Sequence, residues 1–313
     1  MQLHRRTDRL PPLHEESDSV NSTMTPAELA TLADDIEARA WVDYYDAAPP
    51  ALRDALGIAH DRVADATVLL APGVELALFN RAIGLGLRTP ANEDSVAQVA
   101  AAFTAAGSRQ WWLHVNAHAQ PRDTALSLEA AGWWPAESAN WVKMLRPAGV
   151  VDAGAVGAGE KTLRVAASTD ADADAIVDAI VDAITRGFGL PPFFATWLCA
   201  LHGRPRWQLY GVFDGATAVG GGALFLDGDR AWVGIGSMLE SHRRRCGQLA
   251  VMARRVNDAT RAGVRWIATE TGEPTNDVNP SLLNMQRCGF ECVATRRNLL
   301  PPLAIRSSPG TTA

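Results

Sequence analysis

Apolar residues recur every three or four positions between Leu29 and Ala40, a spacing that predicts an amphipathic helix near the start of the chain. The residues before this helix are polar and contain prolines, with no apolar run of signal-peptide length. We therefore expect a disordered tail over 1–24, with Met24 as a candidate for the biological start. A second tail is expected at 304–313.

Strand and helix patterns alternate along the second half of the chain. The expected strands are 163–165, 207–213, 218–226, 231–236 and 265–270, with a last one beginning at Glu291. The expected helices are 170–185, 194–201, 245–262 and 280–287. Asp-Gly pairs at 214–215 and 227–228 predict hairpin turns between consecutive strands.

The first half ends in the same order of elements. It reads as a helix at 92–106, a strand at 111–115, a helix at 122–131 and a strand at 140–145. Gly132 is followed by Trp133 just as Gly289 is followed by Phe290 in the second half. This similarity indicates a duplicated fold whose two sequences have diverged. The alternative is that any α/β protein would give such an order.

A Gly/Ala-rich stretch at 149–159 separates the halves and is typical of a linker. A chain of 313 residues also suggests two domains, at about 150 residues each. The expected division is a tail at 1–24, a first domain at 25–148, a linker at 149–159, a second domain at 160–303 and a tail at 304–313.

The overall composition excludes several classes of protein. With 47% hydrophobic and 20% charged residues, the chain is globular rather than disordered. The net charge is −6 and no apolar run reaches the about 18 residues of a membrane helix, so neither nucleic acid nor a membrane is an expected partner. The four cysteines form no C-x-x-C pair, so no metal is expected, and unpaired thiols favour a cytoplasmic location.

Positive charge is concentrated at 241–265, which contains seven Arg and one Asp for a local charge of +6. Three of these arginines, at 243–245, lie at the start of a predicted helix. The first N–H groups and the positive dipole end of a helix make that a poor place for cations unless an anion is bound. An anionic ligand, most simply a phosphate, therefore suits this loop. A solvated or ion-paired arginine face is the alternative.

At this loop the sequence resembles the GNAT superfamily of acyl-CoA-dependent N-acyltransferases. The family's Q/R-x-x-G-x-G/A loop corresponds to 243–248, with Cys246 and Gln248 at the two glycine positions. A branch with H-R-x-R-G-x-Q-x-A-L is closer, since only Cys246 departs from it in the loop. The segments 269–273 and 279–290 are similar to the E-T-G-E and N-P-S-x-x-N-M-x-R-x-G-F segments of the same branch.

The resemblance implies an α/β fold with two GNAT-like domains, each a mixed, mostly antiparallel sheet flanked by helices. The first domain is a degenerate copy in which no cofactor is expected. Acetyl-CoA would bind the second, with its acyl arm in a gap between two splayed strands, near the N–H groups of Met238 and Leu239. The implied cofactor-binding residues are Met238, Leu239, Arg243, Arg244, Arg245, Cys246, Gly247, Gln248, Leu249, Ala250, Asn279 and Asn284. Of these, Asn279 is also expected to cap a helix.

The implied reaction moves an acetyl group from acetyl-CoA to a primary amine of a small molecule or protein, in a monomer or homodimer. Glu270 is the candidate base, acting through water, although an ordinary structural carboxylate is an equal alternative. Met285 stands where many relatives have a Tyr that protonates the thiolate. Thiolate is a good leaving group near neutral pH, so this loss need not abolish activity. Tyr210 is a distant substitute.

Two other interpretations stay open. The same fold could serve a non-catalytic acyl-CoA-binding or sensor protein, which the substitutions at Cys246 and Met285 favour. The Trp-rich first half could also bind another protein, although paired tryptophans are more often core residues. His202 and His242 are expected to be structural or surface residues.

Overall fold

The protein is described by a computed structural model over residues 24–306, apart from 137–139, 155–162, 171–173 and 275–278. The helices are α1 (Pro26–Asp46), α2 (Pro50–Leu56), α3 (Glu93–Ala106), α4 (Thr124–Ala130), α5 (Asp174–Phe188), α6 (Phe193–Cys199), α7 (Gly247–Arg261), α8 (Pro280–Arg287) and α9 (Leu303–Arg306), with 3-10 turns η1 (Ala77–Phe79) and η2 (Glu240–His242). The strands are β1 (Ala59–Val63), β2 (Ala66–Leu70), β3 (Arg81–Ile83), β4 (Trp112–Asn116), β5 (Trp134–Pro135), β6 (Trp141–Pro147), β7 (Leu163–Ala167), β8 (Trp207–Asp214), β9 (Thr217–Asp227), β10 (Arg230–Met238), β11 (Trp266–Gly272) and β12 (Glu291–Leu300).

Most expected elements are present with ends shifted by a few residues. The segment 50–83, in which no elements were expected, contains α2, η1 and the first three strands. The expected tails lie outside the described residues, except that α9 occupies the start of the second one.

The described strands join into one twelve-stranded sheet in the order β1-β2-β3-β4-β12-β6-β11-β10-β9-β8-β7, with β5 paired to β12. Among them, β3 pairs with β4 in parallel and β10 pairs with β11 in parallel, whereas the other pairs are antiparallel. The expected mixed, mostly antiparallel sheet flanked by helices is therefore confirmed. The two sets of strands are continuous rather than separate.

The two halves exchange their last strands. β6, which ends the first half, pairs along its whole length with β11 of the second half, from Trp141 opposite Gly272 to Pro147 opposite Trp266. β12, which ends the second half, pairs with β4 of the first half and with β6. The division of the chain at 149–159 therefore does not divide the sheet.

Each half nevertheless has the same core topology. A helix bridges a parallel pair of strands in both, α3 between β3 and β4 and α7 between β10 and β11. A shorter helix, α4 or α8, then precedes the exchanged strand. This order supports the interpretation of a duplicated fold.

The start of the expected linker is packed rather than free. The N–H of Gly149 donates to the Thr260 hydroxyl at 3.1 Å, and the N–H of Val151 donates to Asn257 at 2.7 Å. Val151 is itself buried. The first residues of 149–159 are thus held against α7, and 155–159 lie outside the described residues.

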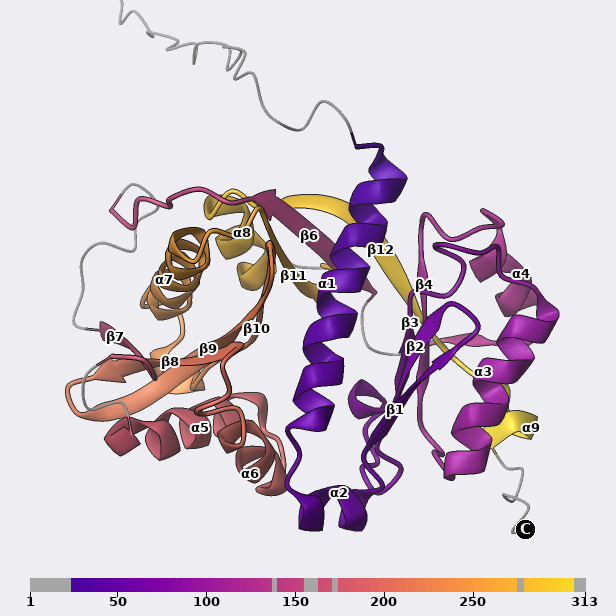
Figure 1. The fold of residues 1–313 in the computed structure, drawn as a ribbon, viewed down its shortest axis with the longest axis horizontal. Helices are drawn as coiled ribbons and strands as arrows, with labels where there is room; N and C mark the ends of the chain where they lie inside the picture. The colour runs from indigo at the N-terminus through magenta and orange to yellow at the C-terminus, as the bar shows by residue number, and fades with distance from the viewer. Residues whose placement is uncertain (1–23, 137–139, 155–162, 171–173, 275–278, 307–313) are drawn as a thin grey trace, which may run out of the picture.

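Helices cover both faces of the sheet in the second half. Neighbouring strand residues point to opposite faces, and a Cβ on Gly221 would meet Ile184 of α5, whereas one on Gly222 would meet Arg255 of α7. One core joins α1, α5 and α6, and another joins α7 and α8. Figure 1 shows α1 crossing the middle of the molecule between the two sets of strands.

Candidate functional site

The parallel strands β10 and β11 separate soon after they meet. They pair only from Arg230 to Trp232 of β10. Beyond this point β10 follows β9, with a bulge between Gly234 and Ser237, and β11 follows β6. Ile235 within the bulge has a left-handed φ of 51°. The separation leaves a gap in the middle of the sheet, as expected from the resemblance.

Only one of the two backbone amides expected in this gap faces it. The N–H of Leu239 donates to Val219 on β9 at 2.9 Å, so it is already used. Successive N–H groups on a strand point to opposite sides. The N–H of Met238 therefore points away from β9, toward the gap, whereas the N–H of Leu239 is bonded within the sheet.

A cavity of about 660 Å³, here called the loop cavity, lies between the end of β10, the start of α7 and α8. Several predicted cofactor-binding residues line it: Met238, Arg243, Arg244, Cys246, Gly247, Gln248, Leu249 and Asn284. Four others are absent from its described lining: Leu239, Arg245, Ala250 and Asn279. Arg287 of α8 also lines it and was not among the predicted residues.

Most of the arginines between 241 and 265 are neutralised within the protein. Arg245 pairs with Asp214 at 2.8 Å, which explains why it faces away from the loop cavity. Arg254, Arg261 and Arg265 also pair with aspartates. Within the described residues, Arg243 and Arg244 have no carboxylate partner, and both are exposed. Arg255 also has no carboxylate partner among the described residues, but it is buried. The exposed arginines of this segment without such a partner are therefore Arg243 and Arg244, at the mouth of this cavity.

Asn279 has the capping role that was expected for it. Its side-chain oxygen accepts from the N–H groups of Ser281 and Leu282, and its amide donates to the carbonyl of Gly272 at 2.5 Å. It joins the end of β11 to the start of α8 rather than facing the loop cavity. Asn284 instead donates to Gln248 at 3.1 Å, within the cavity wall.

The residue before α7 has a strained backbone. Cys246 has φ 61°, in the left-handed region that glycine adopts without cost, and this is the position where the family loop has glycine. A non-glycine residue there costs about 1–2 kcal/mol. Helix α7 also approaches the sheet closely, since a Cβ on Gly247 would lie 3.0 Å from Val212.

Replacing Cys246 with Gly should therefore stabilise the protein. The relieved strain exceeds the larger backbone entropy that glycine loses on folding, so the free energy of unfolding should rise by about 0.5–1 kcal/mol. Urea unfolding measures this change. The control is Cys246→Ala, which removes the thiol but keeps the strain. An equal gain in both variants would contradict the backbone explanation.

A second cavity of about 300 Å³, here called the gap cavity, occupies the space between β10 and β11. Trp232 and Glu270 line it on the α1 side, and Thr269 and Met285 line it on the α7–α8 side. Gln248 lines both cavities, as do Phe188, Gly236 and Ser281. The two cavities therefore adjoin through the gap in the sheet.

Glu270 lies at the wall of the gap cavity in a nearly buried position. Its side chain is 8% exposed, accepts a hydrogen bond from Lys143 at 2.8 Å and accepts from the Trp232 indole N–H at 3.0 and 3.1 Å. Burial, and then the negative charge of Glu37, raise the pKa of Glu270 above its ordinary value. A carboxyl with a raised pKa beside a cavity has the properties of a general base.

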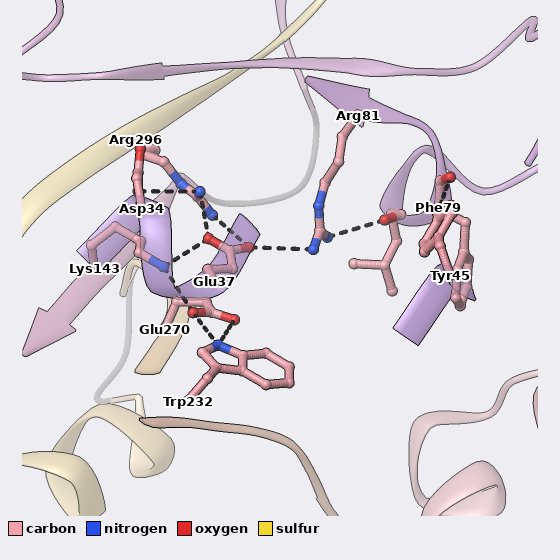
Figure 2. Close-up of polar contacts among 10 residues, drawn as sticks. Asp34, Glu37, Tyr45, Phe79, Arg81, Lys143, Trp232, Glu270 and Arg296 are labelled. Carbon is pink, nitrogen blue, oxygen red and sulfur yellow. Dashed lines mark hydrogen bonds and ion pairs between the residues drawn. The ribbon is translucent and has the colours of Figure 1, made fainter. Parts of the chain in front are cut away.

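Lys143 connects Glu270 to a buried charge cluster at the junction of the halves (Figure 2). Glu37 of α1 is its centre, accepting from Lys143 at 2.7 Å, Arg296 at 2.6 Å and Arg81 at 3.2 Å. Burial alone would raise the pKa of Glu37, but Arg296, Lys143 and Arg81 hold it well below its ordinary value. The cluster joins α1, β3, β6 and β12, so it connects both exchanged strands to the first half.

Arg255 of α7 supports the bulge that opens the gap. Its guanidinium is buried and donates to the carbonyls of Ala223 at 3.0 Å and Gly234 at 2.9 Å. Burial lowers the pKa of Arg255 to about 10, which leaves it charged at neutral pH. These bonds satisfy strand carbonyls where the ladder is interrupted, so Arg255 holds the open form of the strands.

Of the side chains considered for proton transfer, Glu270 lines the gap cavity, whereas Tyr210 and His242 are absent from its described lining. Met285 lines the cavity but carries no proton. The Tyr210 hydroxyl contacts Gln208 at 2.6 Å and Asp258 at 2.8 Å, and this residue is absent from the described lining of either cavity. His242 lies 3.3 Å from Asp214 at the edge of the loop cavity. Glu270 is therefore the carboxyl in position to exchange a proton.

The sequence did not indicate which residues of the first half line the gap cavity. Trp41 of α1, Leu78 of η1 and Trp141 of β6 all line it. In the sequence they could be recognised only as core residues. Helical apolar spacing and paired tryptophans indicate burial, whether or not the residues line a site. Trp141 reaches the site on the exchanged strand β6, whereas Trp41 and Leu78 reach it on α1 and η1.

The fold matches solved structures, whereas the sequence matches no family model and no curated protein. A GCN5-related N-acetyltransferase from Kribbella flavida is 17% identical with a TM-score of 0.57, over 87% of this chain and 96% of that one. One from Sphaerobacter thermophilus is 17% identical with a TM-score of 0.51, over 88% and 93%. A tandem GNAT protein from the clavulanic acid biosynthesis pathway is 14% identical with a TM-score of 0.50, over 75% and 77%. The chain therefore has the fold of the GCN5-related N-acetyltransferases, the GNAT fold.

None of the helices in the described part of the chain is both long and apolar enough to cross a membrane. Over the same residues, His, Cys, Asp and Glu side chains form no group of three or more suited to a metal ion.

Proposed function

We propose that the protein is an N-acetyltransferase that moves an acetyl group from acetyl-CoA to a primary amine. The observation that carries this proposal is the continuity of the two cavities. A loop cavity with two unpaired arginines at a helix start adjoins a gap that holds a carboxyl with a raised pKa. The GNAT fold supports acyl transfer in general, and the geometry supports the order of the two substrates along the gap.

Acetyl-CoA fits the chemistry of the loop cavity. Arg243, Arg244 and the first N–H groups of α7 offer positive charge and donors for a pyrophosphate. Asn284 and Gln248 offer amide groups along the wall for the cofactor arm. The Met238 N–H, pointing into the gap, can polarise the thioester carbonyl as negative charge develops on its oxygen.

Glu270 has the role of general base in this proposal. An amine attacks only as its free base, so the ammonium must lose a proton before or during attack on the thioester. The Glu270 carboxylate accepts that proton, directly or through one water. The thiolate leaves without a protein donor, because Met285 has no proton to give and thiolates are stable leaving groups near neutral pH.

Titration calorimetry with acetyl-CoA, followed by thiol release across a panel of amines, tests the proposal. Binding at micromolar concentration with turnover of at least one amine is the expected result. Binding without turnover would support the alternative of a non-catalytic acyl-CoA sensor, which Met285 at the expected acid position favours. No binding would exclude both functions.

The two unpaired arginines should contribute strongly to cofactor affinity. Replacing Arg243 or Arg244 with Ala should raise the Kd for acetyl-CoA about tenfold, since each removes a charged donor to a phosphate. Added salt should reduce the difference between these variants and the unaltered protein. Arg245→Ala is the matched control from the same loop, because Arg245 pairs with Asp214. Equal losses in all three variants would contradict this assignment.

A further inference from the structure

The α1 side of the gap cavity identifies the chemical class of the acceptor. The loop cavity, where acetyl-CoA is proposed to bind, lies on the α7–α8 side of the gap. An acceptor that reaches the thioester must therefore approach from the α1 side. On that side the described lining is dominated by rings and aliphatic groups: Trp41, Trp141, Trp232, Phe194, Leu78 and Leu190. The volume of about 300 Å³ is at the lower end for small-molecule sites.

The tryptophans of this wall are held rigidly in place. Trp232 and Trp41 meet edge to face, with ring centroids 6.0 Å apart. A Cβ on Gly234 would overlap the Trp232 ring, so this glycine leaves room for the indole along the strand. The Arg81 guanidinium lies over both Trp41, at 4.1 Å, and Trp141, at 5.2 Å. Rings fixed in this way form a preformed apolar pocket, here called the slot.

The charges around the slot admit one amine and no more. Glu270 is the one carboxylate among the described residues that line the gap cavity. Its Oε2 already accepts from Lys143 and Trp232, whereas its Oε1 accepts from Trp232 alone, which leaves room for one further donor. Arg81 occupies ring faces of Trp41 and Trp141, so these faces are not left to bind a second cation.

Polycationic and polyhydroxylated amines do not match this wall. A second ammonium or a set of hydroxyls buried against Trp41, Phe194 and Leu190 would lose water without gaining hydrogen-bond partners. A flat apolar body instead buries its surface against the rings and keeps only the amine at Glu270.

We propose that the acceptor is a compact primary amine with an aromatic or similarly flat apolar body, bound with its nitrogen at Glu270 and its body in the slot. This inference rests on the proposed function for the transfer step, but not for acceptor binding. It also gives the first half a role, because Trp41, Leu78 and Trp141 belong to it. The degenerate half then determines which amine is accepted.

The test compares three probe amines on the full chain with acetyl-CoA. The kcat/KM for 2-phenylethylamine should exceed that for spermidine or glucosamine about 100-fold. Binding of each amine is also measured by calorimetry in the presence of CoA, which needs no turnover. A preference for spermidine or glucosamine in either measurement would overturn the inference.

A matched pair of variants locates the slot. Leu78→Trp places a larger side chain in the gap cavity and should lower both kcat/KM and affinity for 2-phenylethylamine about tenfold or more. Leu76→Trp changes a residue that is 38% exposed in the same turn and should leave both unchanged. The Kd for acetyl-CoA should be the same in both variants. Equal amine binding by the two variants would overturn the inference.

The two proposals can fail separately. If acetyl-CoA does not bind but 2-phenylethylamine does, and Leu78→Trp weakens it, the transfer function fails and the slot stands. If acetyl-CoA is turned over with spermidine as the best acceptor, the transfer function stands and the slot fails.

Discussion

Replacing Glu270 with Gln is expected to lower kcat about 100-fold or more while the Kd for acetyl-CoA stays the same, because positioned general bases contribute about 100-fold to 10,000-fold. The amide keeps the shape of the carboxyl but cannot take the amine proton. Lys143 retains Glu37 as a partner, so the fold should be preserved. Thiol release under saturating substrates gives kcat, and calorimetry gives the Kd.

The pH dependence separates a base from a structural carboxylate. Glu270 works as a base only when deprotonated, so the rate of the unaltered enzyme should rise as pH increases through its pKa. Burial and Glu37 raise that pKa, which places this rise above the ordinary range of a glutamate. The rise should disappear in Glu270→Gln. It should persist in Glu273→Gln, a control whose carboxyl contacts Asn140 outside the described cavity lining. An unchanged profile in Glu270→Gln would assign Glu270 a structural role.

Replacing Glu37 with Gln is expected to reduce the free energy of unfolding by about 3–5 kcal/mol, because it leaves the buried Arg81 without a carboxylate partner among the described residues. It also leaves Lys143 with Glu270 alone and Arg296 with Asp34 alone. Arg81, Lys143 and Arg296 all contact this carboxylate, and the side chains of all four residues are 0% exposed. Urea unfolding of both proteins measures the difference.

The control for Glu37 is a second acid on the same helix. Asp35 pairs with Arg88 near the surface, so Asp35→Asn should cost at most about 1 kcal/mol. The Glu37 contribution also depends on pH. Its pKa is lowered in the folded state, so the stabilisation is complete above the pKa of the unfolded chain and is lost as pH falls through the folded pKa. A loss as small as that of Asp35→Asn would contradict a central role for Glu37.

The loop and the helix after it could be predicted from the sequence because their signals are local. The strand, the arginines and the helix that begins near Gly247 lie within a few turns of one another, and the helix was predicted to within two residues of its observed start. Which of the arginines form ion pairs could not be predicted from the sequence. Arg245 differs from Arg243 only in facing Asp214, a partner from another part of the chain.

The strand exchange could not be predicted from the sequence. The alternation of apolar and polar residues indicates which side chains of a strand are buried, but not which strand it pairs with. β6 and β12 have the alternation that was expected of them, yet each pairs across the halves. The pairing of β6 with β11 also brings Trp141 to the gap cavity. Trp41 and Trp141 had the pattern of core residues, and only the three-dimensional arrangement brings them to Glu270.

The exchange also has a consequence for synthesis on the ribosome. β4 and β6 are made early, but both depend on β12, which is the last strand to emerge, and β6 depends on β11 as well. Until then the growing chain exposes unpaired strand edges, which are prone to aggregate. A chain that stops before Glu291 is therefore not a smaller protein with one domain missing, but a sheet left open at its centre.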